Sequence, residues 1–553
     1  MSLTLKLLGI VAVLFTAQQL FAMAMDQQMQ YQQAEQPQYY AQQNTANDHY
    51  YSSSHDENRP LRYTDDEPIP KTTTHQQAIP SATNTTTTQS SPENLISLDM
   101  KLKYPIILPP KKTVSEHMLL TLTTKEISLS ERTPMDLVWV VDTSGSMAGE
   151  KIKLLKDTLK YMLTMLSSQD RLAIVRFSSE ATRLTPLKFA NSQNEQYFTG
   201  VIDSSEASGG TNIGAGILTA IEVLRGRVYN DRVSSIFVLS DGQDNDVYAE
   251  DNIRNMLSEN TDISGYTIHT FGYGYDHDPI LMGNIAKMRD GNFYFIEKLT
   301  TAAAGFADAL GGVATVVAEN VAISVRPLQS SLFSHVTIEK GFGGEFIWKK
   351  TPEGWYETNI KQFSSGKSKN YVLTLSLGAV TPLWDNHFAE SGVAKAVITY
   401  NLPGKTEKIT KEIDLIVRVT ADEEEFKRQR PDSQVLLNYY RVRAGEAIQE
   451  SSKLAEVGKY EVGKKTLIDL KEELKQSAVN SDQSIIDTIA DLDKFAAKME
   501  PETYQQEGIF DMQQNIGSYM KESSNPYSDR GKGYSNLAQS EMVGKAKKWS
   551  GWH

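Results

Sequence analysis

Residues 136–147 read Asp-Leu-Val-Trp-Val-Val-Asp-Thr-Ser-Gly-Ser-Met, and this stretch decides the fold. Its first part, 136–141, is a nearly continuous apolar run with the length of one strand, which is typical of a strand buried on both faces. Apolar residues then recur at helical spacing over 150–166. The stretch therefore predicts a strand, a polar loop over 142–147 and a helix in succession.

The same order of strand, loop and helix repeats down to residue 317. Further buried strands are predicted at 171–177, 233–239, 266–271 and 292–296, and helices at 213–224, 251–257, 279–288 and 300–317. Strands that alternate with helices form parallel sheets, because each crossover helix packs back onto the sheet. The sequence therefore predicts an α/β fold with a doubly wound, mostly parallel, Rossmann-like sheet. Ligands bind such sheets at the carboxyl ends of the strands.

Oxygen-bearing side chains lie in three loops of this predicted domain. Asp142, Ser144 and Ser146 form an Asp-x-Ser-x-Ser arrangement after the first strand, Thr211 opens a helix after Ser-Gly-Gly, and Asp241 follows the strand at 233–239. We expect them to meet at one edge of the sheet. Hard oxygen ligands without sulfur or imidazole select Mg²⁺ first, with Mn²⁺ and Ca²⁺ as alternatives. These residues are the predicted metal site.

Four nearby residues have more than one interpretation. Asp244 and Asp246, just beyond Asp241, form either a second cation site or a solvated acidic loop, and we favour the loop. His269 and His277 are interpreted as structural or exposed histidines, because hydrolysis needs an activated water and a positioned general base, and the motif itself has no histidine beside it.

The three loops, in this order and on this strand pattern, resemble the von Willebrand factor A domain and its metal-ion-dependent adhesion site. The resemblance covers residues 134–317. It implies that Ser144, Ser146 and Thr211 bind Mg²⁺ through their hydroxyls, and that Asp142 and Asp241 bind it directly or through water. It also implies a protein partner that presents an Asp or Glu to the metal. For the last helix, 300–317, it implies the machinery that couples ligand binding to helix movement in adhesion members of the family, and whether this chain uses that machinery stays open. The flanking regions resemble, less specifically, proteins related to inter-α-trypsin-inhibitor heavy chains.

The flanks of this domain carry other patterns. Alternating and apolar runs with glycine-rich turns predict a β-sandwich over 318–425, which the strands at 93–133 are expected to join. Leucine and isoleucine stripes predict a helical bundle over 426–500. The polar, tyrosine-dotted remainder, 501–553, is predicted to be a flexible tail.

The N-terminal region differs in composition from the rest. Residues 1–24 have the charged, apolar and small-residue segments of a signal peptide. Residues 25–92 are rich in Gln and Tyr and then in Thr and Ser, which predicts a disordered arm, and Asn84 is an N-glycosylation acceptor whose use stays open. We therefore expect a secreted protein or one on the extracellular surface, periplasmic in a bacterium, with no transmembrane segment in the mature chain.

Composition and motifs exclude several classes of function. The chain has no Cys, which excludes disulfides and thiolate metal sites, and its net charge of −13 argues against nucleic-acid binding. Neither a Gly-x-Ser-x-Gly nor a His-Glu-x-x-His motif occurs, so we expect no enzyme. The sequence thus predicts a protein that binds a protein partner through Mg²⁺. The alternative is a structural component of an extracellular coat or fibre, whose termini self-associate and whose α/β domain is a spacer.

Overall fold

The computed structural model describes residues 64–66, 95–127, 132–380 and 388–550. The predicted signal peptide, Asn84 and nearly all of the predicted arm lie outside the described residues. Contacts divide the chain into two units, Met1–Thr64 and Asp65–His553, and the second contains every helix and strand described below. No helix in the described ranges is both long enough and apolar enough to cross a membrane.

The central sheet confirms the predicted α/β fold. Its strand order is β10-β9-β8-β4-β5-β6, with the short β7 also paired to β5. Strands β4, β5, β8, β9 and β10 are parallel, and β6 and β7 run antiparallel to β5 at the edge. The strands are β4 (Met135–Asp142), β5 (Arg171–Phe177), β6 (Ala181–Arg183), β7 (Lys188–Phe189), β8 (Val233–Ser240), β9 (Thr267–Tyr273) and β10 (Phe293–Ile296). All eight residues of β4 are buried, as the apolar run predicts.

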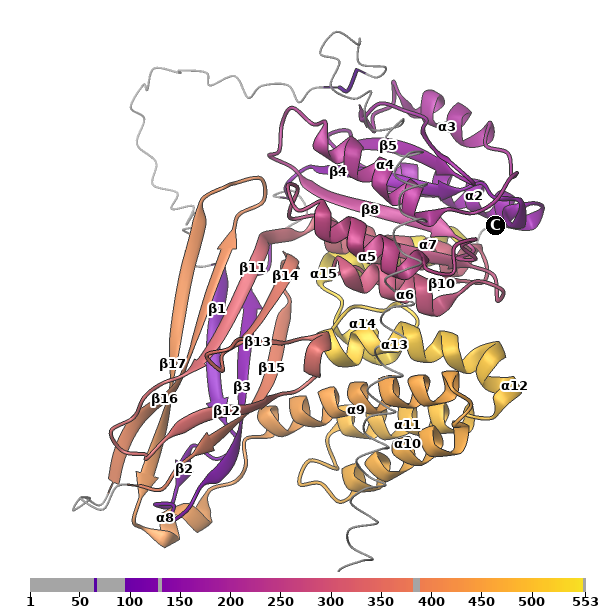
Figure 1. Ribbon diagram of the computed structural model, residues 1–553. Coiled ribbons are helices and arrows are strands. Elements are labelled where there is room, and N and C mark those ends of the chain that lie inside the picture. Colours follow the sequence, from indigo (N-terminus) through magenta and orange to yellow (C-terminus); the bar gives the residue numbers. More distant parts are fainter. Residues whose placement is uncertain (1–63, 67–94, 128–131, 381–387, 551–553) are drawn as a thin grey trace, which may run out of the picture. The chain divides into compact units, whose positions relative to one another are not determined.

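Helices cover both faces of this sheet (Figure 1). One apolar core packs the sheet against α2, α3 and α7, and a second packs its other face against α4, α5 and α6. The helices are α2 (Glu150–Met165), α3 (Glu195–Asp203), α4 (Ile213–Arg225), α5 (Ala249–Glu259), α6 (Pro279–Met288) and α7 (Leu299–Ala314). Helix α7 ends at Ala314 and not at the predicted residue 317, because Val316 and Val317 already belong to the next strand, β11 (Val316–Pro327), in which Val316 pairs with Ser364.

The β-sandwich is built from strands on both sides of this α/β domain in the sequence. One sheet has the order β1-β3-β15-β12 and the other has the order β13-β14-β11-β16-β17-β2. The remaining strands are β1 (Ile96–Leu102), β2 (Ile106–Ile107), β3 (Val114–Thr124), β12 (Val336–Gly341), β13 (Lys349–Lys350), β14 (Tyr356–Ser364), β15 (Ser368–Leu377), β16 (Phe388–Asn401) and β17 (Lys408–Thr420). Because β3 pairs with β15 along its length, the α/β domain is an insertion in the β domain.

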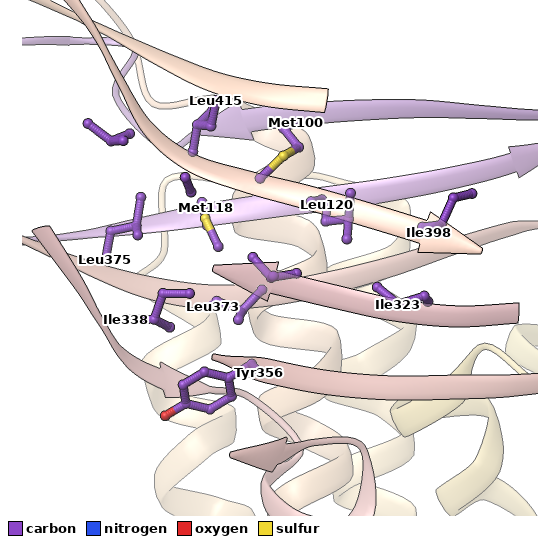
Figure 2. Close-up of a cluster of buried hydrophobic side chains, with 14 of the residues drawn as sticks. Met100, Met118, Leu120, Ile323, Ile338, Tyr356, Leu373, Leu375, Ile398 and Leu415 are labelled. Atoms are coloured by element: carbon purple, nitrogen blue, oxygen red, sulfur yellow. The ribbon is translucent and has the colours of Figure 1, made fainter. Parts of the chain in front are cut away.

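Apolar side chains of the two sheets meet in one core (Figure 2). Leu120 of β3 and Leu375 of β15 come from one sheet, and Ile323 of β11 and Leu415 of β17 come from the other. All four are at most 3% exposed, so this interface is a dry sandwich core of the kind that aligned β-sheets form.

The C-terminal region is helical throughout its described part. Helix α8 (Glu423–Arg428) packs against β17, and the bundle consists of α9 (Ser433–Glu456), α10 (Tyr460–Lys475) and α11 (Gln483–Ala497). It continues through α12 (Pro501–Thr503), a π-helical turn at Tyr504–Gly508, α13 (Ile509–Lys521), α14 (Asp529–Gly533) and α15 (Leu537–Ser550).

The prediction of a flexible tail over 501–553 is therefore wrong for residues 501–550. Tyr504 and Tyr519 are fully buried, and their hydroxyls pair with Ser452 at 2.9 Å and with Asp491 at 2.6 Å. Helix α15 packs along α7, and the ring of its Trp549 stacks on Tyr161 of α2 with the ring centroids 3.9 Å apart. The polar composition is misleading, because tertiary partners bury aromatic rings that form no continuous stripe in the sequence.

Candidate metal centre

The first predicted loop begins where β4 ends. Asp142 is fully buried, and its two carboxylate oxygens accept hydrogen bonds from the Ser144 amide at 2.7 Å and the Ser240 hydroxyl at 2.5 Å. Burial raises the pKa of Asp142 to about 6, and the nearby charge of Asp241 adds to this shift. Because Ser240 is the last residue of β8, these bonds fix the loop to the neighbouring strand.

The two serines of this loop present their hydroxyls to each other. Ser144 precedes a single 3₁₀ turn, Gly145–Met147, and the Ser144 and Ser146 hydroxyl oxygens are 3.0 Å apart. Adjacent ligands of an octahedral Mg²⁺ at about 2.1 Å are separated by about 3 Å. The spacing therefore fits two neighbouring ligands of one small cation.

Backbone hydrogen bonds connect the second loop to the first. The Gly145 amide donates to the Gly209 carbonyl at 3.0 Å, and the Ser208 amide donates to the Thr143 carbonyl at 2.7 Å. Gly209 has a positive φ of 83°, a backbone conformation that favours glycine. These contacts place Thr211, which is 6% exposed, beside the loop that carries the serines.

The third loop follows β8 and bonds to the second. The Asn245 amide donates to the Thr211 carbonyl at 3.0 Å, and the Asn245 side chain accepts the Thr211 amide in return. Asp241 is fully buried, and one of its oxygens, Oδ2, accepts a hydrogen bond from Lys151 at 3.0 Å. The other oxygen, Oδ1, has no hydrogen-bond partner among the described residues. The fold thus brings the loops of all five predicted residues together.

The acidic residues beyond Asp241 bind backbone amides. Asp244 accepts from Ile213 at 2.7 Å, at the start of α4, and from Asp246 at 2.9 Å. Asp246 accepts from Tyr248 at 2.9 Å. These carboxylates order the loop, which is a use that neither of the two predicted interpretations included.

Both histidines are buried. His269 accepts the Asn292 amide at 3.1 Å, and burial lowers its pKa to about 3. His277 pairs through Nδ1 with the Gly274 carbonyl, and burial lowers its pKa to about 4. Both imidazoles are therefore uncharged at neutral pH, and the prediction of a structural role for His269 agrees with these contacts.

Lys151, Ser240 and Asp276 are contacts of the site that the sequence analysis did not include. Lys151, in the first turn of α2, bridges Asp241 and Asp276, with 2.7 Å between its ammonium and the Asp276 carboxylate. A pairing over 90 residues has no signature in a single sequence, whereas Ser240 stands directly before Asp241 at the end of a predicted strand. Of these contacts, only that of Ser240 could have been inferred from the sequence, because Ser240 directly precedes Asp241.

Groups of three or more His, Cys, Asp or Glu side chains that could hold a metal do not occur in the described part of the chain. An ion at the predicted site would therefore depend on the hydroxyls of Ser144, Ser146 and Thr211 together with the two aspartates. The 3.0 Å hydroxyl spacing and the unpaired, buried oxygen of Asp241 fit such an ion.

Comparison with known proteins defines the class of this domain. Residues 136–308 match the family model of the von Willebrand factor type A domain. The predicted resemblance is confirmed, and this segment is a von Willebrand factor type A domain within a longer chain.

Two curated relatives match part of this chain. Uncharacterized protein YfbK of Escherichia coli is 32% identical over 178 residues, which cover 31% of this chain and 30% of the relative. Inter-alpha-trypsin inhibitor heavy chain H4 of Homo sapiens is 32% identical over 154 residues, which cover 26% of this chain and 16% of the relative. The matched segment spans less than a third of either relative.

A solved structure shares more of the fold. The von Willebrand factor type A protein from Catenulispora acidiphila aligns with a TM-score of 0.57 and 16% identity, over 76% of this chain and 97% of that one. At this identity the likeness shows the fold alone.

Proposed function

We propose that this protein binds a protein partner through a Mg²⁺ ion held at the rim of the von Willebrand factor type A domain. Ser144, Ser146 and Thr211 supply neutral hydroxyl ligands, and Asp142 and Asp241 supply carboxylates that act directly or through water. A partner's Asp or Glu completes the coordination. Mn²⁺ and Ca²⁺ are alternative ions with the same ligand preference.

The observation that carries this proposal is the unpaired oxygen of Asp241. A buried carboxylate oxygen without a hydrogen bond is costly, because it has lost its water and gained no partner. A cation bound by this oxygen removes that cost. The loop that holds Asp241 is bonded to the loop of Thr211, which is bonded to the loop of Ser144 and Ser146.

The chemistry of the ligands favours binding over catalysis. A Mg²⁺ ion supplies a strong positive charge, and three neutral hydroxyls leave much of that charge uncompensated for an incoming carboxylate. Hydrolysis would need a general base within hydrogen-bond reach. His277, the histidine two residues before the start of α6, is buried and uses Nδ1 on the Gly274 carbonyl.

The rim also offers apolar contact area. Val247 and Tyr248 lie on the loop of Asp241 and are 90% and 68% exposed. Tyrosine is among the residue types that are enriched in the hot spots of protein interfaces. Since the chain carries a net charge of −13, attraction of an acidic partner is confined to within about a Debye length of 8 Å at physiological salt. The partner is therefore recognised on contact and is not steered from a distance.

We further propose that this binding takes place outside the cytoplasm, on the extracellular surface or in secreted material. The support is the signal-peptide pattern of residues 1–24.

Metal titration and partner capture test the proposal together. The variant Ser144→Ala plus Ser146→Ala removes two hydroxyls, and Ser97→Ala plus Ser258→Ala, at two exposed positions, is the matched control. Calorimetry should show one Mg²⁺ site in wild type and control and at least tenfold weaker binding in the site variant. Proteins captured from secreted or surface material by wild type should be released by EDTA and recovered with Mg²⁺. Equal Mg²⁺ affinity in the site variant and the control would refute the proposed ligands.

A further inference from the structure

Two consecutive aspartates, Asp65 and Asp66, are held on the edge of the central sheet. Asp65 and Asp66 contact the segment from Arg183 to Phe189, which contains β7 and the residues that precede it. Arg171, whose guanidinium contacts Asp66, is the first residue of β5, whereas the metal loops follow the carboxyl ends of the strands. A seven-residue strand spans about 20 Å, so the two sites are distinct.

Each of the two carboxylates accepts hydrogen bonds from a backbone amide and from a cationic side chain, and Asp66 also accepts one from the Asn194 side chain at 3.5 Å. Asp65 accepts from the Leu187 amide at 2.7 Å and from the Arg183 guanidinium. Asp66 accepts from the Phe189 amide at 3.0 Å and from the Lys188 ammonium at 3.3 Å. Charge-assisted hydrogen bonds of this kind are stronger than neutral ones, so the site selects acidic side chains.

The backbone of the dipeptide is held as well. The Asp66 amide donates to the Leu187 carbonyl at 2.9 Å, and the Asp66 carbonyl accepts from Arg171 at 2.6 Å. Arg171 is 1% exposed and is fixed by its ion pair with Asp136 at 2.8 Å. Main-chain bonds along a sheet edge, combined with pockets for side chains, are how proteins recognise extended peptides.

We propose that this is a binding site for an acidic peptide and that a second copy of the chain fills it with its own Asp65 and Asp66. The support is the charge complementarity of the site and the length of the tether. The contact uses two residues, and 28 residues, 67–94, separate them from Leu95. Such a tether gives the chain's own aspartates an effective concentration on the order of 1 mM. At protein concentrations well below this value, each chain therefore fills its own site. At higher concentrations, chains bind each other's aspartates and become linked.

Two full-length variants distinguish chains that bind their own Asp65 and Asp66 from chains that bind the aspartates of a second copy. Asp65→Asn plus Asp66→Asn gives an acceptor chain with intact cations and no acidic ligand. Arg183→Gln plus Lys188→Gln gives a donor chain with intact aspartates and a weakened site. Matched controls are Glu423→Gln plus Glu424→Gln and Lys427→Gln plus Arg428→Gln, which make the same charge changes on the exposed face of α8.

Sedimentation equilibrium measures the association. Acceptor and donor alone should each have the mass of one chain, and their mixture at about 0.5 mM each should show a species of twice that mass, in EDTA as in Mg²⁺. Mixtures of wild type with either control variant should show less association. Each of these chains keeps its own Asp65 and Asp66, which compete with those of the other chain for the same site. If the donor variant melts below wild type, Lys188→Gln alone replaces it as the donor.

A peptide of residues 60–70 tests the site separately from exchange. By fluorescence anisotropy, it should bind the acceptor chain at least tenfold more tightly than wild type, and a peptide with Asn at both aspartates should bind at least tenfold more weakly. No binding of the peptide to the acceptor would overturn the site. Binding of the peptide without association of acceptor and donor would overturn the second copy as its occupant. Because the metal site is not involved, neither result depends on the proposed function.

Discussion

The ammonium of Lys151 lies 3.0 Å from Oδ2 of Asp241, a carboxylate that is fully buried and whose other oxygen has no hydrogen-bond partner within the described ranges of the chain. The same ammonium lies 2.7 Å from Asp276, on the loop after β9. Lys151 therefore pairs with a carboxylate of the loop after β8 and joins this loop to the one after β9. The ammonium compensates part of the negative charge of the Asp241 carboxylate, and the oxygen without a partner can still bind a cation. We therefore expect a change at Lys151 to affect both the stability of the protein and its affinity for Mg²⁺.

Replacement of Lys151 by Met should destabilise the metal-free protein and increase its response to Mg²⁺. Loss of the ammonium leaves the Asp241 carboxylate buried without a cation, at a cost of about 1–3 kcal/mol because Lys151 is partly exposed. The removed positive charge no longer opposes a bound cation, so the rise in melting temperature on adding Mg²⁺ should exceed that of wild type. Lys153→Met, at an exposed position of α2, is the control. A Mg²⁺ response equal to wild type would show that Lys151 does not act on the site.

Thr211 distinguishes a ligand hydroxyl from a packing contact. Thr211→Val keeps the shape of the side chain and removes the hydroxyl, whereas Thr211→Ser keeps the hydroxyl and removes a methyl group. We expect at least a tenfold loss of Mg²⁺ affinity for Val and a small change for Ser, measured by calorimetry. Equal losses in both variants would assign Thr211 a packing role.

Glu319 should make stability fall as pH rises. Burial raises the pKa of this carboxyl to about 7 from a usual value of 4.5. The folded protein therefore holds a proton that the unfolded chain releases, and the resulting penalty develops between pH 4.5 and 7 and is complete above pH 7. Glu319→Gln keeps an acceptor for the Gly404 amide and removes the charge, so it should stabilise the protein above pH 7 by up to about 3 kcal/mol and have no such effect near pH 4.

Urea unfolding of Glu319→Gln at several pH values measures this difference, and Glu357→Gln at an exposed position of β14 is the control. A stabilisation that stays constant between pH 4 and 8 would contradict the raised pKa.

Gln539 tests whether the C-terminal helix is part of the folded domain. Its side chain donates to the Asp308 carbonyl at 2.9 Å and to the Asp308 carboxylate at 3.1 Å, and Asp308 is fully buried in α7. Gln539→Ala should lower the free energy of unfolding by about 1–3 kcal/mol, because it leaves buried acceptors with fewer donors. Gln476→Ala, at an exposed position after α10, should have almost no effect. If both variants unfold alike, the helix is not docked in solution.

The sequence alone determined the α/β domain and the candidate ligands. The run at 136–141 is apolar on both faces because β4 lies in the middle of the sheet, and helical periodicity located α2 and α4. Parallel strands end at the same edge, so residues that follow β4 and β8 had to be neighbours. For Asp142 and Asp241, the order of the strands and the position of each residue in its loop were enough to predict that the two loops meet.

Only the tertiary structure decided the contacts between residues that are distant in the chain. Lys151 with Asp241 and Asp276, Gln539 with Asp308, and Asp66 with Lys188 each join residues at least 90 positions apart. Local patterns report which face of an element is apolar, and they contain no information on the partner that covers it. For the same reason the residues after 501 gave the pattern of a flexible tail, although α7 and the helical bundle bury much of their surface.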